Sequence, residues 1–194
     1  MATESDAAAV RAIYAPFCES SAVSFEERAP TTDEIAERIR KITSQLPWLV
    51  LADEGRVAGY AYASVHRERA AYRWSVDSSV YVSPAFLRSG VGRALYTALF
   101  QLLREQGYYK VYAGITWPNA ASVGIHEAMG FQFVGVYRAV GFKQGAWHDV
   151  AWYQLTLQPQ PLNPADPRPI SSVLASPQWR DAVSNGLERY RKRS

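Results

Sequence analysis

Two glycines lie directly in front of a helix-forming segment, in the stretch RSGVGR from Arg88 to Arg93. The first N–H groups of a helix have no partner within it and lie at the positive end of the helix dipole. Because glycine has no Cβ, a phosphate can approach such groups closely, and the two arginines would add positive charge. Glycines before a helix are equally common in a simple turn, so this motif alone predicts either a turn or a phosphate site. A Walker loop is excluded because the sequence contains no GxxxxGK followed by Ser or Thr. A dinucleotide-binding GxGxxG fingerprint is excluded because Leu95 stands in place of its third glycine.

Asp77 and His126 are side chains that could transfer protons. Asp77 lies two residues before Ser79 and four before Tyr81, so the three share one face of an expected strand. An aspartate of ordinary pKa, about 3.9, is a weak base at neutral pH and needs partial burial or a water relay to act as one. The imidazole of His126 has an ordinary pKa of about 6.5, which suits proton transfer at neutral pH. Taken alone, an aspartate at a strand rim and a structural histidine are the simpler interpretations.

The stretch NAASVGIHEAMGF, from Asn119 to Phe131, favours the functional interpretation. Together with the glycine loop it resembles the GNAT superfamily of N-acetyltransferases, whose loop (Gln or Arg, two residues, Gly, one residue, Gly or Ala) holds the coenzyme A pyrophosphate. The helix motif of that superfamily fits at Asn119, Ser122, Ile125, His126, Gly130 and Phe131. Leu87 replaces the usual Gln or Arg of the loop, but the main phosphate ligands are backbone N–H groups, so the resemblance still implies binding.

Further segments narrow the resemblance to phosphinothricin N-acetyltransferases and their relatives that acetylate methionine sulfone and sulfoximine. These segments are PWLVLADEGRVAGYAYA, WSVDSSVYVS, SGVGRALYTALF and GFKQGAWHDVAWYQ, and the likeness covers residues 5–157. Asp77 stands where that family has Glu, which makes a water relay to the amine more important. Met1 lies nearly where the first strand of the family ends, so we expect the first edge strand to be truncated or absent.

The resemblance implies roles for individual residues. Asp77 and His126 would together accept protons from the amine, in an order that the sequence leaves open, and Tyr96 would lie near the thioester. The backbone of residues 80–82 would pair with the pantetheine arm, and one N–H there would polarise the thioester carbonyl. The full set expected to bind the coenzyme is Val80, Tyr81, Val82, Arg88, Ser89, Gly90, Val91, Gly92, Arg93, Asn119 and Ser122.

An amino-acid substrate with an anionic side chain would need cations and an aromatic wall. The residues predicted to supply them are Phe25, Arg69, Arg73, Trp74 and Lys143, with Arg28, Tyr72 and Trp117 as alternatives. Each arginine could equally be a solvated loop charge. The three histidines and single cysteine show no ligand spacing, so no metal site is predicted.

The elements that must position these residues follow from hydrophobic periodicity. Helices are predicted over residues 6–20 and 33–42, the second capped by Thr32, and then again over 93–106 and 119–129. Strands are predicted within 48–65 as a hairpin, and over 71–83, 109–116, 131–142 and 149–157. This order predicts an α/β (α+β) fold with a mixed, mostly antiparallel central sheet and helices on both faces, as in the GNAT fold.

Composition limits the remaining possibilities. The 194 residues are 48% hydrophobic with one cysteine, Cys18, and no secretory signal is recognised, so a reducing cytoplasm is expected. The formal net charge of +3 lies in the segment from Gln158 onward, which carries six basic and three acidic residues. Residues 1–157 are therefore formally neutral, and neither nucleic acid nor a membrane is an expected partner.

Three parts of the chain are expected. Residues 1–157 would form the acetyltransferase domain, 158–175 a proline-rich linker, and 176–194 an amphipathic helix with a basic tail. Trp179, Val183 and Leu187 form an apolar stripe on that helix, which must dock on its own domain or on a partner subunit, and a homodimer is expected.

The function predicted from the resemblance is acetyl-CoA-dependent acetylation of a small amino-acid-like amine such as phosphinothricin or methionine sulfone or sulfoximine. Two alternatives stay open. One is a coenzyme A-binding regulatory module without catalysis, and the other is an N-acetyltransferase for a polyamine or a protein N-terminus.

Overall fold

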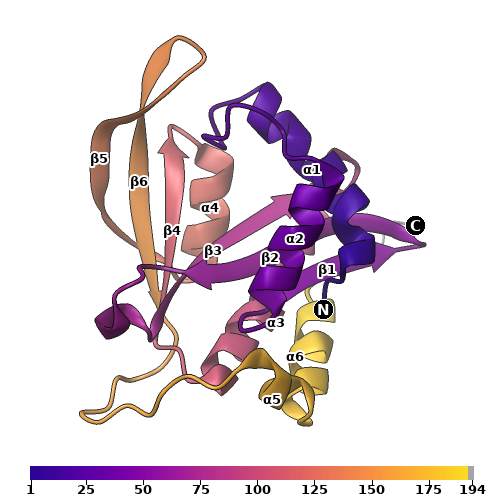
Figure 1. The fold of residues 1–194 in the computed structure, drawn as a ribbon, viewed down its shortest axis with the longest axis vertical. Coiled ribbons are helices and arrows are strands. Elements are labelled where there is room, and N and C mark those ends of the chain that lie inside the picture. Colours follow the sequence, from indigo (N-terminus) through magenta and orange to yellow (C-terminus); the bar gives the residue numbers. More distant parts are fainter. Residues whose placement is uncertain (192–194) are drawn as a thin grey trace.

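A six-stranded mixed sheet forms the centre of the molecule, in the computed structural model that describes residues 1–191. The strands are β1 (Trp48–Asp53), β2 (Arg56–Val65), β3 (Ser75–Val82), β4 (Lys110–Trp117), β5 (Gln132–Lys143) and β6 (Ala146–Thr156). They lie in the order β1-β2-β3-β4-β6-β5, and only β3 and β4 run parallel (Figure 1). The predicted mixed, mostly antiparallel sheet is confirmed.

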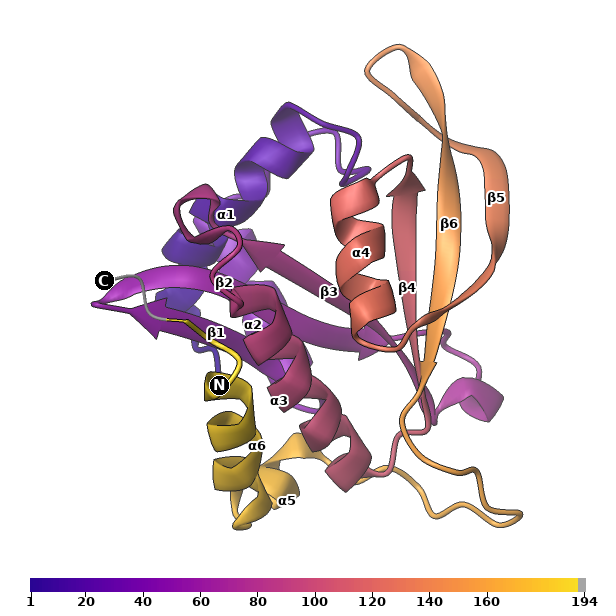
Figure 2. The same ribbon diagram turned by 180° about the vertical axis from the view of Figure 1, so that it is seen from behind.

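Helices cover both faces of this sheet, as predicted. The main ones are α1 (Ala7–Glu19), α2 (Thr32–Thr43), α3 (Val91–Gln106) and α4 (Ala120–Ala128). One hydrophobic cluster joins α1 and α2 to Trp48 and Tyr60 of the sheet, and a second joins α3 to the opposite face. Helices α3 and α4 lie together on that opposite face in Figure 2.

The N-terminal segment contributes a single backbone contact to the sheet. No strand precedes α1 in the described residues; a 3₁₀ turn, η1 (Glu4–Asp6), leads into this helix. The N–H of Ala2 donates to the carbonyl of Trp48 at 2.7 Å, beside the outer strand β1. Within the described residues, the N-terminal segment therefore adds no strand to the sheet.

The start of α2 differs by one residue from the prediction. Thr31, not Thr32, is the N-cap, because its Oγ1 accepts from the N–H of Glu34 at 3.2 Å. The Glu34 carboxylate accepts in turn from the N–H of Thr31, which completes a capping box. A glutamate three residues after the cap distinguishes the two threonines, so the sequence held the signal.

The C-terminal part of the chain packs against α3. It contains α5 (Ile170–Leu174) and α6 (Gln178–Leu187), which lie beside α3 in both ribbon views (Figures 1 and 2). Ile170 and Val173 are buried in the same cluster as α3, so the predicted linker includes a folded helix. Trp179 also packs against this cluster, so the helix docks on its own domain. Of the predicted basic tail, residues 192–194 lie outside the described part.

Candidate active site

The sheet opens between β3 and β4. Their parallel pairing extends only from Ser75 with Lys110 to Asp77 with Tyr112, after which β4 pairs with β6 alone. The two strands diverge beyond that point (Figure 2). A small hollow of about 70 Å³ fills the opening and is lined by residues of both strands together with Tyr96 and His126. The backbone edge of residues 78–82 that faces away from β2 therefore borders this opening.

A long groove of about 910 Å³ runs from this opening along the glycine loop and α4. It shares Val80, Tyr81, Asn119 and Ser122 with the hollow between the strands, so the two spaces adjoin. Ten of the eleven residues predicted to bind the coenzyme line the groove: Val80, Tyr81, Val82, Arg88, Gly90, Val91, Gly92, Arg93, Asn119 and Ser122. Ser89, the eleventh, is buried, and its hydroxyl donates to the carbonyl of Phe86, so it shapes the loop.

The two glycines of the loop are required for different reasons. Gly90 is the N-cap of α3 and has a φ of +86°, a left-handed conformation that favours glycine. Gly92 lies where a Cβ would come within 2.5 Å of Cδ1 of Ile125, so its absence lets α3 and α4 pack closely. The loop is thus both a tight turn and the wall of a groove, and the two sequence interpretations are compatible.

Asn119 holds the start of α4 on the other side of the groove. Its Oδ1 accepts from the N–H of Ser122 at 3.1 Å, which caps the helix. His126 follows one helical turn after Ser122 and contacts Tyr96 of α3.

Tyr96 and His126 form a buried hydrogen-bonded pair. Nδ1 of His126 lies 2.7 Å from the carbonyl oxygen of Ser122, which can only accept, so Nδ1 carries the proton. Nε2 therefore accepts from the hydroxyl of Tyr96, at 3.0 Å. Burial lowers the pKa of His126, with the Ser122 hydrogen bond opposing that shift, and burial also raises the pKa of the Tyr96 hydroxyl. Both residues therefore rest neutral, with the histidine as the proton acceptor.

Asp77 pairs with His66, a residue that sequence reasoning missed. Nδ1 of His66 lies 2.7 Å from Oδ1 of Asp77, and the imidazole stacks on Tyr112 with centroids 4.3 Å apart. The side chains of His66 and Asp77 are only 12% and 28% exposed, respectively. Burial raises the pKa of the Asp77 carboxyl, and the hydrogen bond to His66 offsets part of that rise. The antiparallel register places Ser64 opposite Asp77, and His66 follows two residues later on the same face, so it lies diagonal to Asp77.

A second hollow, of about 330 Å³, adjoins the opening on the side of the β5–β6 hairpin. It shares Gly114 and Thr116 with the hollow between the strands. Its wall is aromatic and aliphatic: Val23, Phe25, Tyr137, Val140, Val150 and Trp152. Phe25, which was predicted for an aromatic wall around the substrate, is one of the residues that line this hollow.

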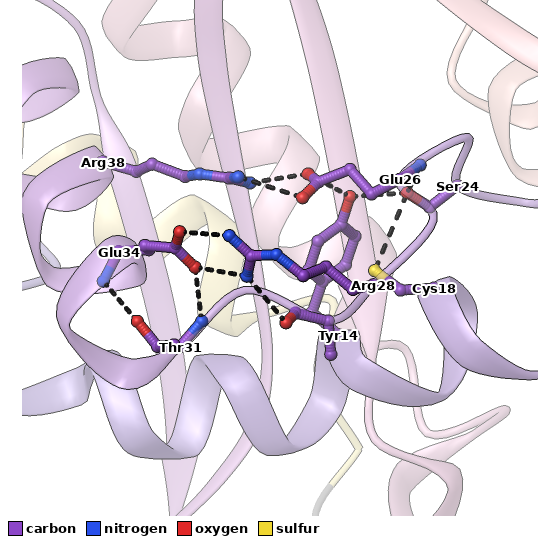
Figure 3. A network of polar contacts seen from close by, with 9 residues as sticks. Tyr14, Cys18, Ser24, Glu26, Arg28, Thr31, Glu34 and Arg38 are labelled. Atoms are coloured by element: carbon purple, nitrogen blue, oxygen red, sulfur yellow. Dashed lines mark hydrogen bonds and ion pairs between the residues drawn. The ribbon is translucent and has the colours of Figure 1, made fainter.

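The loop that carries Val23 and Phe25 is held by a polar network (Figure 3). The hydroxyl of Tyr14 contacts the Ser24 hydroxyl at 2.7 Å and donates to Glu26, which accepts two hydrogen bonds from Arg38. The paired Arg38 lowers the pKa of the Glu26 carboxyl, so this carboxylate stays ionised. The wall of the second hollow is therefore tied to α1 and α2.

Lys143 is a structural residue, contrary to the prediction that it binds substrate. Its ammonium is buried and donates to the carbonyl oxygens of Cys18 and Ser24, each at 2.6 Å. It ties the end of β5 to the loop after α1. Because these contacts use the ammonium for folding, an ion pair with substrate was the wrong assignment.

The other predicted cations lie away from the second hollow. Arg73 pairs with Asp166 at 2.7 Å, and the indole N–H of Trp74 donates to the carbonyl of Ala165, so both contact the proline-rich segment. Arg69 is exposed at the start of the η2 turn (Ala70–Tyr72) and lines none of the three spaces. These three assignments to the substrate site are not supported by the geometry.

Arg67 is the cation that the structure brings to the aromatic wall. Its guanidinium lies 5.9 Å from the ring centroid of Trp152, and Nη1 donates to the carbonyl of His66. Sequence reasoning chose Arg69 and Arg73 from the same segment between β2 and β3, because the sequence does not indicate which of its arginines reaches Trp152.

Two negative findings apply to residues 1–191. No group of three or more His, Cys, Asp or Glu side chains in this range could hold a metal ion. None of the helices there is long and apolar enough to cross a membrane.

The groove and the second hollow both adjoin the opening between β3 and β4. The Tyr96–His126 pair lines this opening, whereas Asp77 and His66 line none of the three spaces. Two adjoining spaces beside a proton acceptor are the arrangement that a group-transfer enzyme with two substrates needs. The family model described as an acetyltransferase (GNAT) domain matches residues 1–152, so the chain belongs to the GNAT acetyltransferase family and is an N-acetyltransferase. Its fold agrees with this assignment.

Three relatives illustrate the similarity. The chain is 42% identical over 172 residues to a phosphinothricin N-acetyltransferase of Streptomyces viridochromogenes, covering 89% of this chain and 92% of that protein. It is 34% identical to an L-methionine sulfoximine/L-methionine sulfone acetyltransferase of Salmonella typhimurium, covering 80% and 92%. A crystal structure of a GNAT phosphinothricin acetyltransferase from Sinorhizobium meliloti in complex with acetyl-CoA superposes with a TM-score of 0.76 at 36% identity, covering 80% and 85%.

Proposed function

We propose that the protein transfers the acetyl group of acetyl-CoA to the amino group of a small amino-acid-like substrate of the phosphinothricin or methionine sulfoximine type. The observation that carries this proposal is that the groove and the second hollow both adjoin the opening between β3 and β4. Each substrate would enter from its own side and meet the other between β3 and β4. The names of the relatives support this substrate class.

The residues of the groove fit coenzyme A. The first N–H groups of α3, with Arg88 and Arg93 beside them, would hold its phosphates. The backbone edge of residues 78–82, beyond the last pairing with β4, would take the pantetheine arm as an added strand. The coenzyme supplies the acetyl group as a thioester at the end of that arm.

The His66–Asp77 pair would accept the first proton from the substrate ammonium. The two groups share one proton across their 2.7 Å contact, and the remaining ring nitrogen of His66 can accept another. The raised pKa of Asp77 makes the pair a better base than an exposed aspartate. The shorter carboxylate, where relatives have glutamate, is thus extended by an imidazole.

The Tyr96–His126 pair would handle the second proton. The amine nitrogen forms a bond to the acetyl carbon while the carbon–sulfur bond breaks, so nitrogen loses a proton and sulfur gains one. Nε2 of neutral His126 can accept the proton through the Tyr96 hydroxyl, and the imidazolium can return it to sulfur. The overall balance is ammonium plus acetyl thioester giving amide, free thiol and one proton released to solvent.

The acceptor would lie in the second hollow. Phe25 and Trp152 offer apolar faces to its carbon chain, and Arg67, above Trp152, offers a positive charge to its anionic group. We further propose a cytoplasmic location, a homodimer, and no requirement for metal, nucleic acid or membrane.

A steady-state assay with acetyl-CoA against phosphinothricin, methionine sulfone and methionine sulfoximine tests this function. Polyamines and an N-terminal peptide belong in the same panel, since they represent the other amine classes. Turnover of the amino-acid analogues is expected, and turnover of the peptide or polyamine alone would assign another substrate class.

A coenzyme-binding module without catalysis is the second candidate, motivated by Asp77 in place of glutamate and by Leu87 in the loop. Calorimetric titration with coenzyme A separates the two functions. Binding without turnover of any amine would favour the module.

A further inference from the structure

The C-terminal segment after α6 crosses the glycine loop of the coenzyme groove. The N–H of Arg191 donates to the carbonyl of Ser89 at 2.9 Å, and the carbonyl of Arg189 lies against Gly90, where a Cβ would collide with it. The hydroxyl of Tyr190 donates to Asp53 at 3.0 Å. This segment lies beyond residues 1–152, which the family model matches.

Helix α6 fixes the start of this segment. Gly186 packs so closely on α3 that a Cβ there would come within 2.7 Å of the carbonyl oxygen of Ala94. The side chain of Asn185 donates to Gln101 of α3 at 2.9 Å. Because Gly90 is the N-cap of α3, residues 188–191 and the glycine loop are attached to the same helix.

The segment adds charge to the groove. Glu188, Arg189 and Arg191 line it together with Arg88 and Arg93, which gives four arginines and one glutamate. The formal charge of the groove lining is therefore +3, compared with +2 from the loop alone. Both C-terminal arginines are exposed, so a ligand in the groove can reach them.

We propose that Arg189 and Arg191 form part of the phosphate-binding site, so that the C-terminal segment clamps the glycine loop and contacts the phosphates of the coenzyme. The proposal rests on the proposed function, because the ligand is the coenzyme of that reaction. Guanidinium groups bind phosphate through charge-assisted and often paired hydrogen bonds, which suits this position.

Calorimetric titration of the full chain with coenzyme A, in the absence of an amine, tests the proposal. The variant Arg189→Ala/Arg191→Ala is expected to bind coenzyme A about tenfold more weakly, from two partly exposed ionic contacts. Arg180→Ala is the matched control, since Arg180 is an exposed arginine of α6 that does not line the groove. The control should bind as the wild type does.

Two further ligands identify the phosphate. If the double variant weakens the binding of 3′-dephospho-coenzyme A as much as that of coenzyme A, the arginines bind the diphosphate. If it does not weaken the binding of 3′-dephospho-coenzyme A, they bind the 3′-phosphate. Pantetheine, which has no phosphate, should bind both proteins equally. The affinity of the double variant should also fall less steeply with salt.

Unchanged affinity in the double variant overturns the proposal, and so does tighter binding, which would show that the segment obstructs the groove. A chain ending at Leu187 is a second test, since it keeps Gly186 and removes the clamp; it is expected to lose at least the same affinity. Lack of coenzyme binding by the wild type would instead contradict the proposed function, so the two failures are distinguishable.

Discussion

At the scale of single residues, the site contains two hydrogen-bonded pairs with different surroundings. Asp77 lies on β3 and His66 in the segment after β2, whereas Tyr96 and His126 belong to helices α3 and α4. Two pairs can divide the two proton transfers that acetylation of an ammonium requires. A single base would have to change its partner during the reaction.

His66 can be tested as a base rather than as a support for Asp77. His66→Ala should lower kcat by a factor of about 10²–10⁴, the usual contribution of a proton-transfer group. His66→Asn keeps a donor for Asp77 but cannot accept a proton, so it should be equally impaired. Near-normal activity of the Asn variant would show that His66 only positions the carboxylate.

His126 and Tyr96 should act as a unit. His126→Ala is expected to lower kcat by a factor of about 10²–10⁴, while the KM for acetyl-CoA changes little. Tyr96→Phe removes the hydroxyl that joins the histidine to the opening, so it should cost a similar factor, and the double variant should be scarcely worse than either single one. Fully additive losses would show that the two residues act separately.

The ionised carboxylate of Asp77 should lower the free energy of unfolding at neutral pH, because burial disfavours its charge. Its pKa is raised by burial, so the folded state binds a proton more readily than the unfolded chain, and stability falls as pH rises through this range. Asp77→Asn removes the charge and keeps an acceptor for His66, so its melting temperature should exceed that of the wild type at pH 7. The difference should vanish below the unfolded pKa of about 3.9, where the carboxyl is protonated in both states. A less stable Asn variant at pH 7 would contradict the role of burial.

At the scale of elements, the start of α3 combines a turn, a groove wall and a helix contact. Gly90→Ala forces a left-handed conformation on alanine and a collision with Arg189, so it should destabilise the protein by about 1–3 kcal/mol. Gly92→Ala meets only the end of the Ile125 side chain, which can rotate at smaller cost but lines the groove.

The KM for acetyl-CoA should therefore rise in both glycine variants, whereas the melting temperature should fall mainly in Gly90→Ala. Steady-state kinetics and thermal unfolding of the two proteins measure this difference. Equal loss of stability would show that the conformation of Gly90 is not the distinguishing feature.

At the scale of the whole molecule, local patterns predicted the elements and the groove, but not the contacts between distant segments. The glycine loop and the α4 motif lie within short stretches, and their residues line one groove. Lys143 failed as a prediction because its partners are carbonyls of Cys18 and Ser24, more than 100 residues away. Sequence patterns contain no information on which backbone oxygen a buried ammonium will reach.

The packing of the C-terminal segment is a second long-range feature that the amino-acid composition did not predict. Its prolines predicted a linker, but the hydrophobic residues between them, Ile170 and Val173, are buried with α3. Trp179 of the predicted apolar stripe packs on the cluster around α3, whereas Leu187 is 53% exposed, and Ala182 and Gly186 form the buried face of α6. The close approach depends on Gly186, which has no side chain to reveal it in a hydrophobic pattern.

The docking of α6 can be measured through two helical glycines. Gly186→Ala introduces a Cβ within 2.7 Å of a backbone oxygen of α3, which cannot move as a side-chain end can, so it should destabilise the protein by about 1–3 kcal/mol. Gly124→Ala in α4 is the matched control, because a Cβ there meets no atom within 4 Å. Alanine is the better helix former, so this control should stabilise by about 0.4–1 kcal/mol. Denaturant unfolding should give opposite signs for the two substitutions, and a neutral Gly186→Ala would show that α6 does not pack on α3 in solution.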